Sequence, residues 1–250
     1  MRYINRITSK EKISDGMSPA RVYKCQMDEA TYYLKVIDKV FSKTTYSVRR
    51  EAAVMQWLAD KLNVPKLVES GQIEDNEYLI MSELKGQHID DFVTTPLQYI
   101  TYLVQAIKLL WTVDISDCKF SSRLDFRLQE LDYLLKNNLA DVDLANWQDT
   151  TNFTKPEELY SWLCNSRLPE ELAFCHGDIG ANFFVADGEI LFYDLARCGI
   201  ADKWVDIALC VRDIRDYYPD SEYEKIFFDM LGVEPDYKKI DYYILLDEMF

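Results

Sequence analysis

Several residue types and patterns are scarce in this sequence, and each scarcity excludes a class of protein. Its 250 residues include 2 histidines, His88 and His176, and neither has a partner at the spacing of a zinc site or a cysteine–histidine nucleophile. The 8 glycines form neither the phosphate-binding pattern G-x-x-x-x-G-K-S/T nor the dinucleotide pattern G-x-G-x-x-G. No stretch approaches the roughly 18 consecutive apolar residues of a membrane-spanning helix. The first residues also lack the apolar core of a secretory signal, so we expect a cytoplasmic protein without membrane contact.

Basic residues are also few. The sequence has 28 Lys and Arg against 43 Asp and Glu, a formal net charge of -15. Such a charge repels nucleic acid and anionic membranes and attracts cationic small molecules, although solubility alone also accounts for an acidic surface. The 6 cysteines form no C-x-x-C pair, so we expect reduced thiols.

The N-terminal third has the pattern of a small antiparallel sheet with one helix. Apolar and polar residues alternate in segments separated by short polar breaks, which is typical of hairpins. The predicted strands are residues 20–27, 31–38, 66–72 and 77–84. Residues 44–62 have a helical stripe that includes Val54, Met55 and Leu58, with Thr44 and Thr45 as candidate caps.

From Pro96 onward the pattern changes to long helical segments. The predicted helices are residues 97–113, 123–138, 156–165, 202–215, 222–231 and 237–249. One short strand pair is predicted around Asp187-Gly188. We therefore expect an α+β fold of two lobes, with a small sheet lobe over residues 1–84, a larger helical lobe over 85–250, and a connector at 83–91.

The stretch "FCHGDIGANFFVADGEILFYDLA" places polar residues inside an apolar run. Asp187-Gly188 predicts a tight turn, so Asn182 and Asp194 should emerge at the same end of the hairpin, with Asp178 in the loop just before it. Carboxylate and amide oxygens suit Mg²⁺. Asp and Asn also cap turns, His176 can be a satisfied buried histidine, and we interpret His88 as a solvent-exposed loop residue.

Lys35 interrupts an apolar strand, and Glu51 faces inward on the following helix. Each buried charge needs a partner, so we expect the two to pair. A strand lysine, a helix glutamate, an H-x-D motif, an asparagine and a further aspartate occur in this order in protein kinases, where they bind and transfer phosphate.

The ordered motifs extend over nearly the whole chain. They are "GMSPARVYK", "YYLKV", "RREAAVMQWL", "LIMSE", "DISDC", "LDYLL", "ADVD", "HGD", "FFVADG", "DLARCGIADKWVDIALCVRDIR" and "YYILLDEMF". With these motifs the sequence resembles bacterial aminoglycoside 3'-phosphotransferases, which share the protein-kinase-like fold. The resemblance implies transfer of the γ-phosphoryl group of ATP to an aminoglycoside hydroxyl, at the 3' position, and hence antibiotic resistance. GTP in place of ATP is left open, and we expect a monomer or weak dimer.

The resemblance also implies a role for individual residues. Asp178 is expected to be catalytic, and Asn182 and Asp194 to hold Mg²⁺. The residues expected at the nucleotide are Lys35, Glu51, Ser18 in the loop from Gly16, Tyr33 against adenine, and the hinge from Ser82 to Leu84. Core packing is the open alternative for Tyr33. The residues expected at the cationic acceptor are Arg197, Asp216, Asp247, Glu248 and the α-carboxylate of Phe250.

Three departures from the family pattern concern the acceptor and the metal. One residue fewer separates Asp178 from Asn182 than in the usual loop, and a further residue is missing before Asp194. Acids usual in the family are replaced at Ala145 and Gln148, and one is absent beside Ala181. Two alternatives stay open: a kinase of another small amine-bearing alcohol, and a nucleotide-binding protein with degenerate activity.

Overall fold

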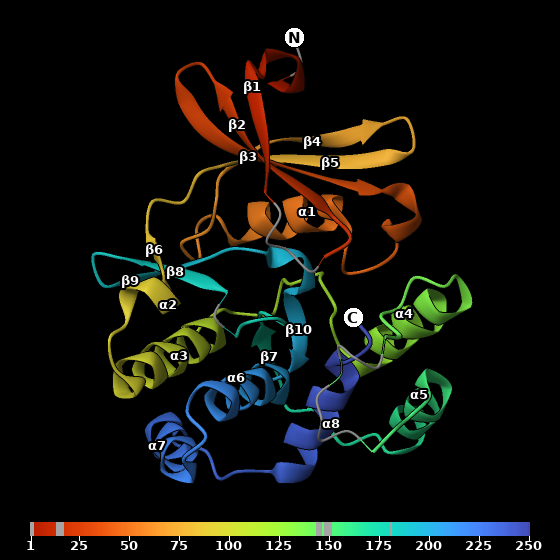
Figure 1. The fold of residues 1–250 in the computed structure, drawn as a ribbon, viewed down its shortest axis with the longest axis vertical. Helices are drawn as coiled ribbons and strands as arrows, with labels where there is room; N and C mark the ends of the chain where they lie inside the picture. Colours follow the sequence, from red (N-terminus) through yellow and green to blue (C-terminus); the bar gives the residue numbers. More distant parts are fainter. Residues whose placement is uncertain (1–2, 14–17, 144–146, 148–151, 181) are drawn as a thin grey trace. The chain divides into compact units, whose positions relative to one another are not determined.

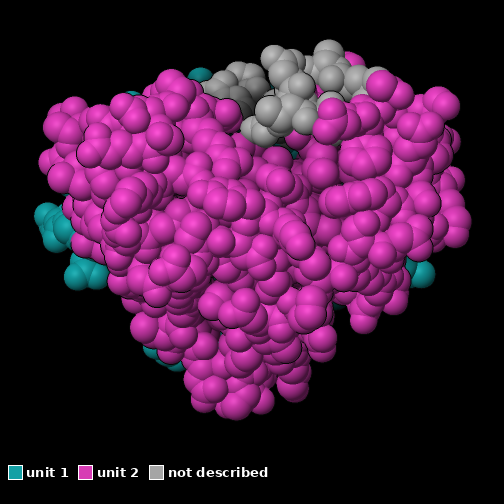
Figure 2. Space-filling model, turned by 90° about the horizontal axis from the view of Figure 1, so that it is seen from below, with its two compact units in different colours: residues 1–92, 182–198 teal, residues 93–181, 199–250 magenta. Residues whose placement is uncertain are grey.

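The computed structural model describes residues 3–13, 18–143, 147, 152–180 and 182–250. The chain forms two compact units, which Figure 2 colours separately. The first unit consists of residues 1–92 and 182–198, and the second of residues 93–181 and 199–250. The chain therefore returns to the first unit for one short segment before it completes the second. Gly16, Ala145, Gln148 and Ala181 lie outside the described residues.

The first unit is built on a five-stranded antiparallel sheet (Figure 1). Its strands, in the order β1-β2-β3-β5-β4, are β1 (Ser9–Ile13), β2 (Arg21–Met27), β3 (Ala30–Asp38), β5 (Asn76–Ser82) and β4 (Leu67–Ile73). All four strands predicted from the alternating pattern are confirmed. The edge strand β1 was not predicted, because its sequence SKEKI is almost wholly exposed and has no apolar alternation to detect.

The two faces of this sheet are covered differently. Cys25, Leu34, Tyr78 and Ile80 form a buried cluster, against which the 3₁₀ helix η1 (Tyr3–Arg6) packs through Ile4. Helix α1 (Val48–Leu58) packs on β3, β4 and β5. The helix begins later than predicted, because Ser47 rather than a threonine is its cap: the Ser47 hydroxyl accepts a hydrogen bond from the Arg50 amide at 3.3 Å.

The second part of the first unit contains the predicted hairpin. Strands β8 (Phe183–Ala186) and β9 (Glu189–Phe192) pair antiparallel, and β6 (Gln87–His88) adds to β8 before the short helix α2 (Ile89–Phe92). His88 is not a solvent-exposed loop residue as predicted. It lies in β6, its side chain is 29% exposed, and its Nε2 is 3.1 Å from the Tyr193 hydroxyl. Aromatic residues in β8 and just after β9 partly cover its ring. They lie far from His88 in the chain, so the sequence shows no sign of this contact.

The second unit is mostly helical (Figure 1). Its helices are α3 (Pro96–Trp111), α4 (Leu124–Lys136), α5 (Pro156–Asn165), α6 (Trp204–Tyr217), α7 (Ser221–Leu231) and α8 (Tyr237–Asp247). All six were predicted, and their ends differ from the prediction by at most two residues. Helix α6 packs on α8, and α3 packs on α7. Strands β7 (Leu172–Cys175) and β10 (Gly199–Asp202) form an antiparallel pair that was not predicted. Among the described helices, none is long and apolar enough to span a bilayer.

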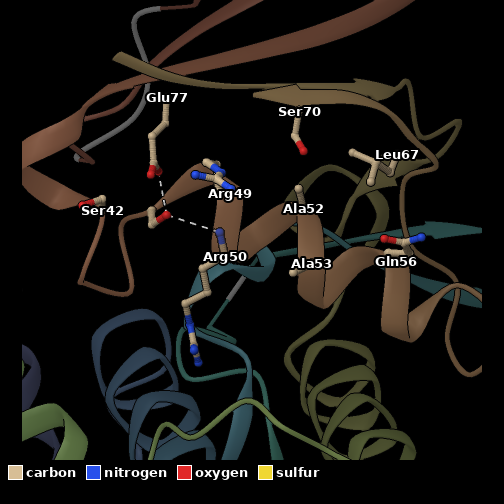
Figure 3. A pocket seen from close by; sticks show the side chains of 10 residues that line it. Ser42, Arg49, Arg50, Ala52, Ala53, Gln56, Leu67, Ser70 and Glu77 are labelled. Atoms are coloured by element: carbon tan, nitrogen blue, oxygen red, sulfur yellow. Dashed lines mark hydrogen bonds between the residues drawn. The ribbon is translucent and has the colours of Figure 1, made fainter. Parts of the chain in front are cut away.

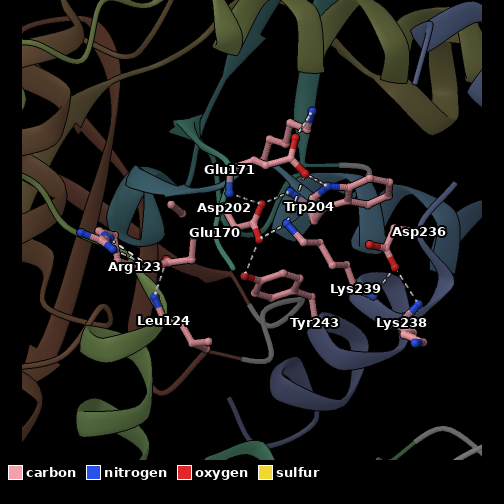
Figure 4. A network of polar contacts seen from close by, with 12 residues as sticks. Arg123, Leu124, Glu170, Glu171, Asp202, Trp204, Asp236, Lys238, Lys239 and Tyr243 are labelled. Atoms are coloured by element: carbon pink, nitrogen blue, oxygen red, sulfur yellow. Dashed lines mark hydrogen bonds and ion pairs between the residues drawn. The ribbon is translucent and has the colours of Figure 1, made fainter. Parts of the chain in front are cut away.

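A buried polar network ties the β7–β10 pair to α8 (Figure 4). Asp202 Oδ2 accepts hydrogen bonds from Lys239 Nζ at 2.9 Å and from the Tyr243 hydroxyl at 3.0 Å. Lys239 also reaches Glu171, where hydrogen bonds from Lys203 and Trp204 lower the pKa of the carboxyl to about 2. Removing one partner of such a buried pair leaves an uncompensated charge, so the network fixes α8 on the strand pair.

The hairpin turn gives a stability prediction. Gly188 has φ +81, and a Cβ added there would have no atom within 4 Å, so any cost of a side chain comes from the backbone alone. Gly188→Ala is therefore expected to lower the free energy of unfolding by about 1 kcal/mol. The urea midpoint measures this change, with Glu189→Ala as the exposed control on the same hairpin. Equal midpoints for Gly188→Ala and the wild type would contradict the prediction.

Candidate functional site

The first unit contains a group of three charges in which Lys35 and Glu51 are buried and Asp194 is partly exposed. Lys35 on β3 donates to Glu51 on α1, with Nζ–Oε1 at 2.8 Å and Nζ–Oε2 at 3.0 Å. The same ammonium donates to Asp194 Oδ1 at 2.8 Å. The pairing of Lys35 with Glu51 predicted from the sequence is thus confirmed. Asp194 as a second partner was not predicted, because residues 93–181, which belong to the second unit, separate it in the chain from Lys35 and Glu51.

These contacts decide the ionisation of the lysine. Burial by itself lowers the pKa of Lys35, but the charges of Asp194 and Glu51 outweigh it and raise the pKa above its ordinary value. Burial raises the pKa of Glu51, and Lys35 partly offsets this rise. Glu51 Oε1 also accepts from the Leu195 amide at 3.3 Å. The lysine is therefore a fixed cation, suited to contact with an anion.

Asn182 and Asp194 lie at the same end of the β8–β9 hairpin, as predicted. Phe183 pairs with Phe192, so the residues just outside this pair, Asn182 before β8 and Tyr193-Asp194 after β9, leave the hairpin together. The Tyr193 hydroxyl donates to Asn182 Oδ1 at 3.4 Å. Asp194 has a left-handed backbone with φ 56 and a side chain that is 37% exposed. One carboxylate and one amide oxygen fit Mg²⁺, which takes oxygen ligands and completes its shell with phosphates and water.

The other residues expected at a nucleotide are also in the first unit. Tyr33 is half-buried and stands two residues before Lys35 on β3, so both side chains leave the same face of the sheet. Ser82 ends β5, where its amide donates to the Lys66 carbonyl at 3.0 Å, and Leu84 follows, half-buried. The exposed Ser18 precedes β2, and its Oγ accepts from the Ala20 amide at 3.2 Å.

Asp178 lies in the second unit, in the loop after β7. The start of this loop is held by Asp206 on α6. Its two carboxylate oxygens accept hydrogen bonds from the amides of His176 and Gly177, both at 2.8 Å. Asp206 is completely buried, and burial raises its pKa. His176 is also completely buried, which agrees with the interpretation as a core histidine.

The residues expected at the acceptor fall into two groups. Arg197 is in the first unit, with its guanidinium 5.8 Å from the centroid of the Tyr46 ring. The others are in the second unit: Asp216 is exposed on α6, Asp247 and Glu248 end α8, and the Phe250 ring lies 3.6 Å from the Arg127 guanidinium. Arg212 Nη1 donates to Asp247 Oδ2 at 2.7 Å.

Comparison with known proteins identifies the group to which this chain is related. A family model described as "Phosphotransferase enzyme family" matches residues 11–243. This chain belongs to that family. Aminoglycoside 3'-phosphotransferases are similar to it: that of Campylobacter jejuni is 62% identical over 100% of both chains, and that of Enterococcus faecalis is 47% identical over 96% of this chain and 92% of the relative.

Solved structures of the same kind share the fold of this phosphotransferase. A crystal structure of an aminoglycoside-3'-phosphotransferase of type VIII superposes with a TM-score of 0.80 and 24% identity, and covers 98% of this chain and 96% of that chain. The α+β, protein-kinase-like fold expected from the sequence, with its antiparallel sheet followed by a helical part, is thus confirmed.

Three charged residues of α6 near the loop of the phosphotransferase were missed by sequence reasoning: Asp206, Arg212 and Asp213. Asp206 left a signal, since a carboxylate within the apolar run "WVDIALC" needs a buried partner. Arg212 and Asp213 left none, because each is a charged residue near the polar end of a helix. Their positions follow only from the packing of α6 on α8 and against the loop.

The carboxyl group of Asp213 is largely buried, which is unfavourable for its charged form. Its side chain is 16% exposed. The Tyr99 hydroxyl donates to its Oδ2 at 3.4 Å, and Arg212 Nε is 4.0 Å from its Oδ1. Burial raises the pKa of Asp213 to about 7, helped by the charges of Asp216 and Asp178 and opposed by Arg212. At neutral pH this carboxyl is therefore divided between its two ionisation states.

A separate pocket of about 610 Å³ lies in the first unit, between α1 and the strands β4 and β5 (Figure 3). It is lined by Ser42, Ser47, Arg49, Arg50, Ala52, Ala53, Gln56, Leu67, Ser70 and Glu77. Ser47 Oγ donates to the buried Glu77 at 2.6 Å, while Arg50 donates to the carbonyls of Ala196 and Cys198. None of the residues expected at the nucleotide or the acceptor lines this pocket.

The raised pKa of Asp213 predicts a pH-dependent stability. Between about pH 4 and pH 7 the folded protein keeps a proton on this carboxyl that the unfolded chain has lost, so its contribution to stability falls as pH rises through this window. Asp213→Asn cannot ionise. Its Tm is expected to equal that of the wild type at pH 4 and to exceed it by roughly 10 °C at pH 8, because a pKa raised from 3.8 to about 7 corresponds to about 4 kcal/mol.

Calorimetry at the two pH values measures this difference. Asp229→Asn, on the exposed face of α7, is the control and should show the same Tm difference at both pH values. A Tm difference between Asp213→Asn and the wild type that does not change with pH would contradict the raised pKa.

Proposed function

We propose that this protein transfers the γ-phosphoryl group of ATP to the 3'-hydroxyl of an aminoglycoside and so confers resistance to it. The observation that carries the proposal is the Lys35–Glu51–Asp194 group, a buried, fixed cation next to a partly exposed carboxylate that can hold a metal. The acceptor follows from the relatives named aminoglycoside 3'-phosphotransferase, one of which is 62% identical over the whole chain.

Lys35 would bind the nucleotide phosphates, and Glu51 would hold its ammonium in place. Asn182 and Asp194 would hold Mg²⁺, which neutralises phosphate charge when it is bound. The oxygen of the acceptor hydroxyl would bond to the γ-phosphorus while the bond between this phosphorus and the leaving ADP oxygen breaks. Asp178 would accept the proton that the hydroxyl loses. Phosphoryl transfer requires little more than such positioning and charge neutralisation.

The remaining nucleotide contacts would come from residues near the sheet. Tyr33 shares a face of β3 with Lys35 and would lie against the adenine ring. The backbone after β5, from Ser82 to Leu84, would bind the adenine edge, and Ser18 would cover the phosphates. The amide of Ser82 already donates to Lys66, so the contacts would use the other backbone groups. In this scheme residues 1–84 form the nucleotide-binding lobe and 85–250 the catalytic lobe.

Acidic groups would bind the ammonium groups of the acceptor. Asp216, Asp247 and Glu248 supply carboxylates in the second unit, and the α-carboxylate of Phe250 and Arg197 would contribute as the resemblance implies. Asp247 is oriented by its hydrogen bond from Arg212. Several charge-assisted contacts bind a polycation without requiring one rigid geometry.

The missing acids favour one second candidate. The loop lacks an acid beside Ala181, and Ala145 and Gln148 replace acids in an earlier segment. In that case the kinase would phosphorylate another small amine-bearing alcohol with fewer ammonium groups. The nucleotide chemistry would be the same, so only the acceptor distinguishes the two.

Release of ADP from Mg²⁺-ATP with different acceptors tests the proposal. Kanamycin and neomycin are expected to stimulate release at least about 100-fold over no acceptor, and tobramycin, which lacks the 3'-hydroxyl, is not. Equal stimulation by tobramycin would contradict the 3' position. Mg²⁺-ATP binding without stimulation by any of the three would favour the second candidate or a degenerate enzyme.

Two substitutions test the assigned roles separately. Asp178→Ala is expected to lower kcat at least about 1,000-fold while the Kd for Mg²⁺-ATP stays within about twofold, because a base lost from the loop does not bind nucleotide. Asp194→Ala is expected to weaken Mg²⁺-ATP binding at least about tenfold. Calorimetric titration measures both Kd values. Retained turnover in Asp178→Ala, or an unchanged metal requirement in Asp194→Ala, would refute the respective role.

A further inference from the structure

Helix α6 presents two carboxylates to the loop that carries Asp178. Asp206 and Asp213 are seven residues apart, which is two helical turns, so their side chains leave the same face of α6. Asp206 accepts hydrogen bonds from the amides of His176 and Gly177, which precede Asp178 in the loop. Asp213 meets the loop at Gly180, after Asp178. The two contacts therefore bracket the expected catalytic residue.

The contact at Gly180 is unusually close. A Cβ built on Gly180 would lie 2.7 Å from Asp213 Oδ2 and 3.5 Å from its Cγ, and the three nearest atoms all belong to Asp213. Gly180 is not among the glycines with positive φ, so its backbone conformation accepts other residues. A side chain at this position would therefore force the Asp213 carboxylate to move away from the loop.

The fold gains little from this carboxylate. Its hydrogen bond from Tyr99 is long, at 3.4 Å, and Arg212 Nε is 4.0 Å away because the Arg212 guanidinium binds Asp247 at 2.7 Å. Partial burial of an acid with such weak partners costs free energy. Local rules of stability are typically broken at functional sites, where the gain lies in the site itself.

We propose that Asp213 is a positioning residue of the phosphotransfer reaction: its carboxylate packs against the loop at Gly180 and helps to hold Asp178 in place. Asp206 supports the other side of the loop through its hydrogen bonds from the amides of His176 and Gly177. The proposal rests on the function proposed for Asp178. It adds a second support, from a helix whose residues were not expected to act on the loop. Misplacement of a catalytic group by about 1 Å costs up to about 100-fold in rate, so such a support has a measurable effect.

Three variants separate this role from a general effect on folding. Asp213→Ala is expected to lower kcat at least about tenfold, while KM for ATP stays within about twofold. Asp213→Asn keeps the shape of the carboxylate and is expected to stay within about threefold of the wild-type kcat. Gly180→Ala adds the methyl group that the carboxylate excludes, and is expected to lower kcat about tenfold. Asp229→Asn is the control and should be unchanged.

The double variant tests whether the two positions act through each other. In Gly180→Ala/Asp213→Ala the new methyl group occupies part of the space that the carboxylate vacated. Its kcat is expected to exceed that of Gly180→Ala at least about threefold, so the two losses should not add. A kcat for Asp213→Ala equal to the wild type, or losses that multiply in the double variant, would overturn the proposal.

A measurement independent of turnover separates this proposal from the function on which it rests. Hydrogen exchange of the amides of residues 176–180 is expected to be at least about fivefold faster in Asp213→Ala than in the wild type, and unchanged in Asp213→Asn. If the wild type transfers phosphate to no aminoglycoside, the proposed function fails, but the exchange result still decides whether Asp213 supports the loop. Equal exchange in Asp213→Ala and the wild type would overturn the support.

Discussion

The buried ammonium of Lys35 is the constraint on which the first unit depends. It joins three parts of the chain, strand β3, helix α1 and the segment after β9, through Glu51 and Asp194. A lysine inside a sheet lobe is unfavourable unless opposite charges surround it, and removing one of those charges leaves the others uncompensated. The position of α1 on the sheet, the cap at Ser47 and the left-handed backbone of Asp194 all serve to bring these charges together.

The second unit meets a different need with a similar device. The loop of Asp178 has backbone amides that require acceptors, and Asp206 supplies two from the buried face of α6. The same helix supplies Arg212 to Asp247 and Asp213 to Gly180. One helix therefore orders both the loop expected to carry out the chemistry and a carboxylate expected to bind the acceptor. The polar network around Asp202 fixes α8, the helix that carries Asp247.

Much of the fold could be predicted because it depends on short-range patterns. The strands β2 to β5, the β8–β9 hairpin and all six long helices follow from apolar periodicity and turn residues. Two of the misses, strand β1 and His88, share one cause, which is that another segment of the chain decides the local structure. Strand β1 has an exposed, charged sequence and forms only by pairing with β2, and His88 is half-buried only because β6 pairs with β8.

The sequence by itself determined which residues could take part in the chemistry: the order of Lys35, Glu51, Asp178, Asn182 and Asp194, and the hairpin that brings the last-named aspartate back beside Asn182. These depend on residue type and on spacing along one segment. Only the tertiary structure decided that Asp194 is the second partner of Lys35 and that Asp206 and Asp213 face the loop. The reason is physical: apolar neighbours can indicate that a helix carboxylate such as Asp206 is buried, but only the packing of distant segments decides which group it meets.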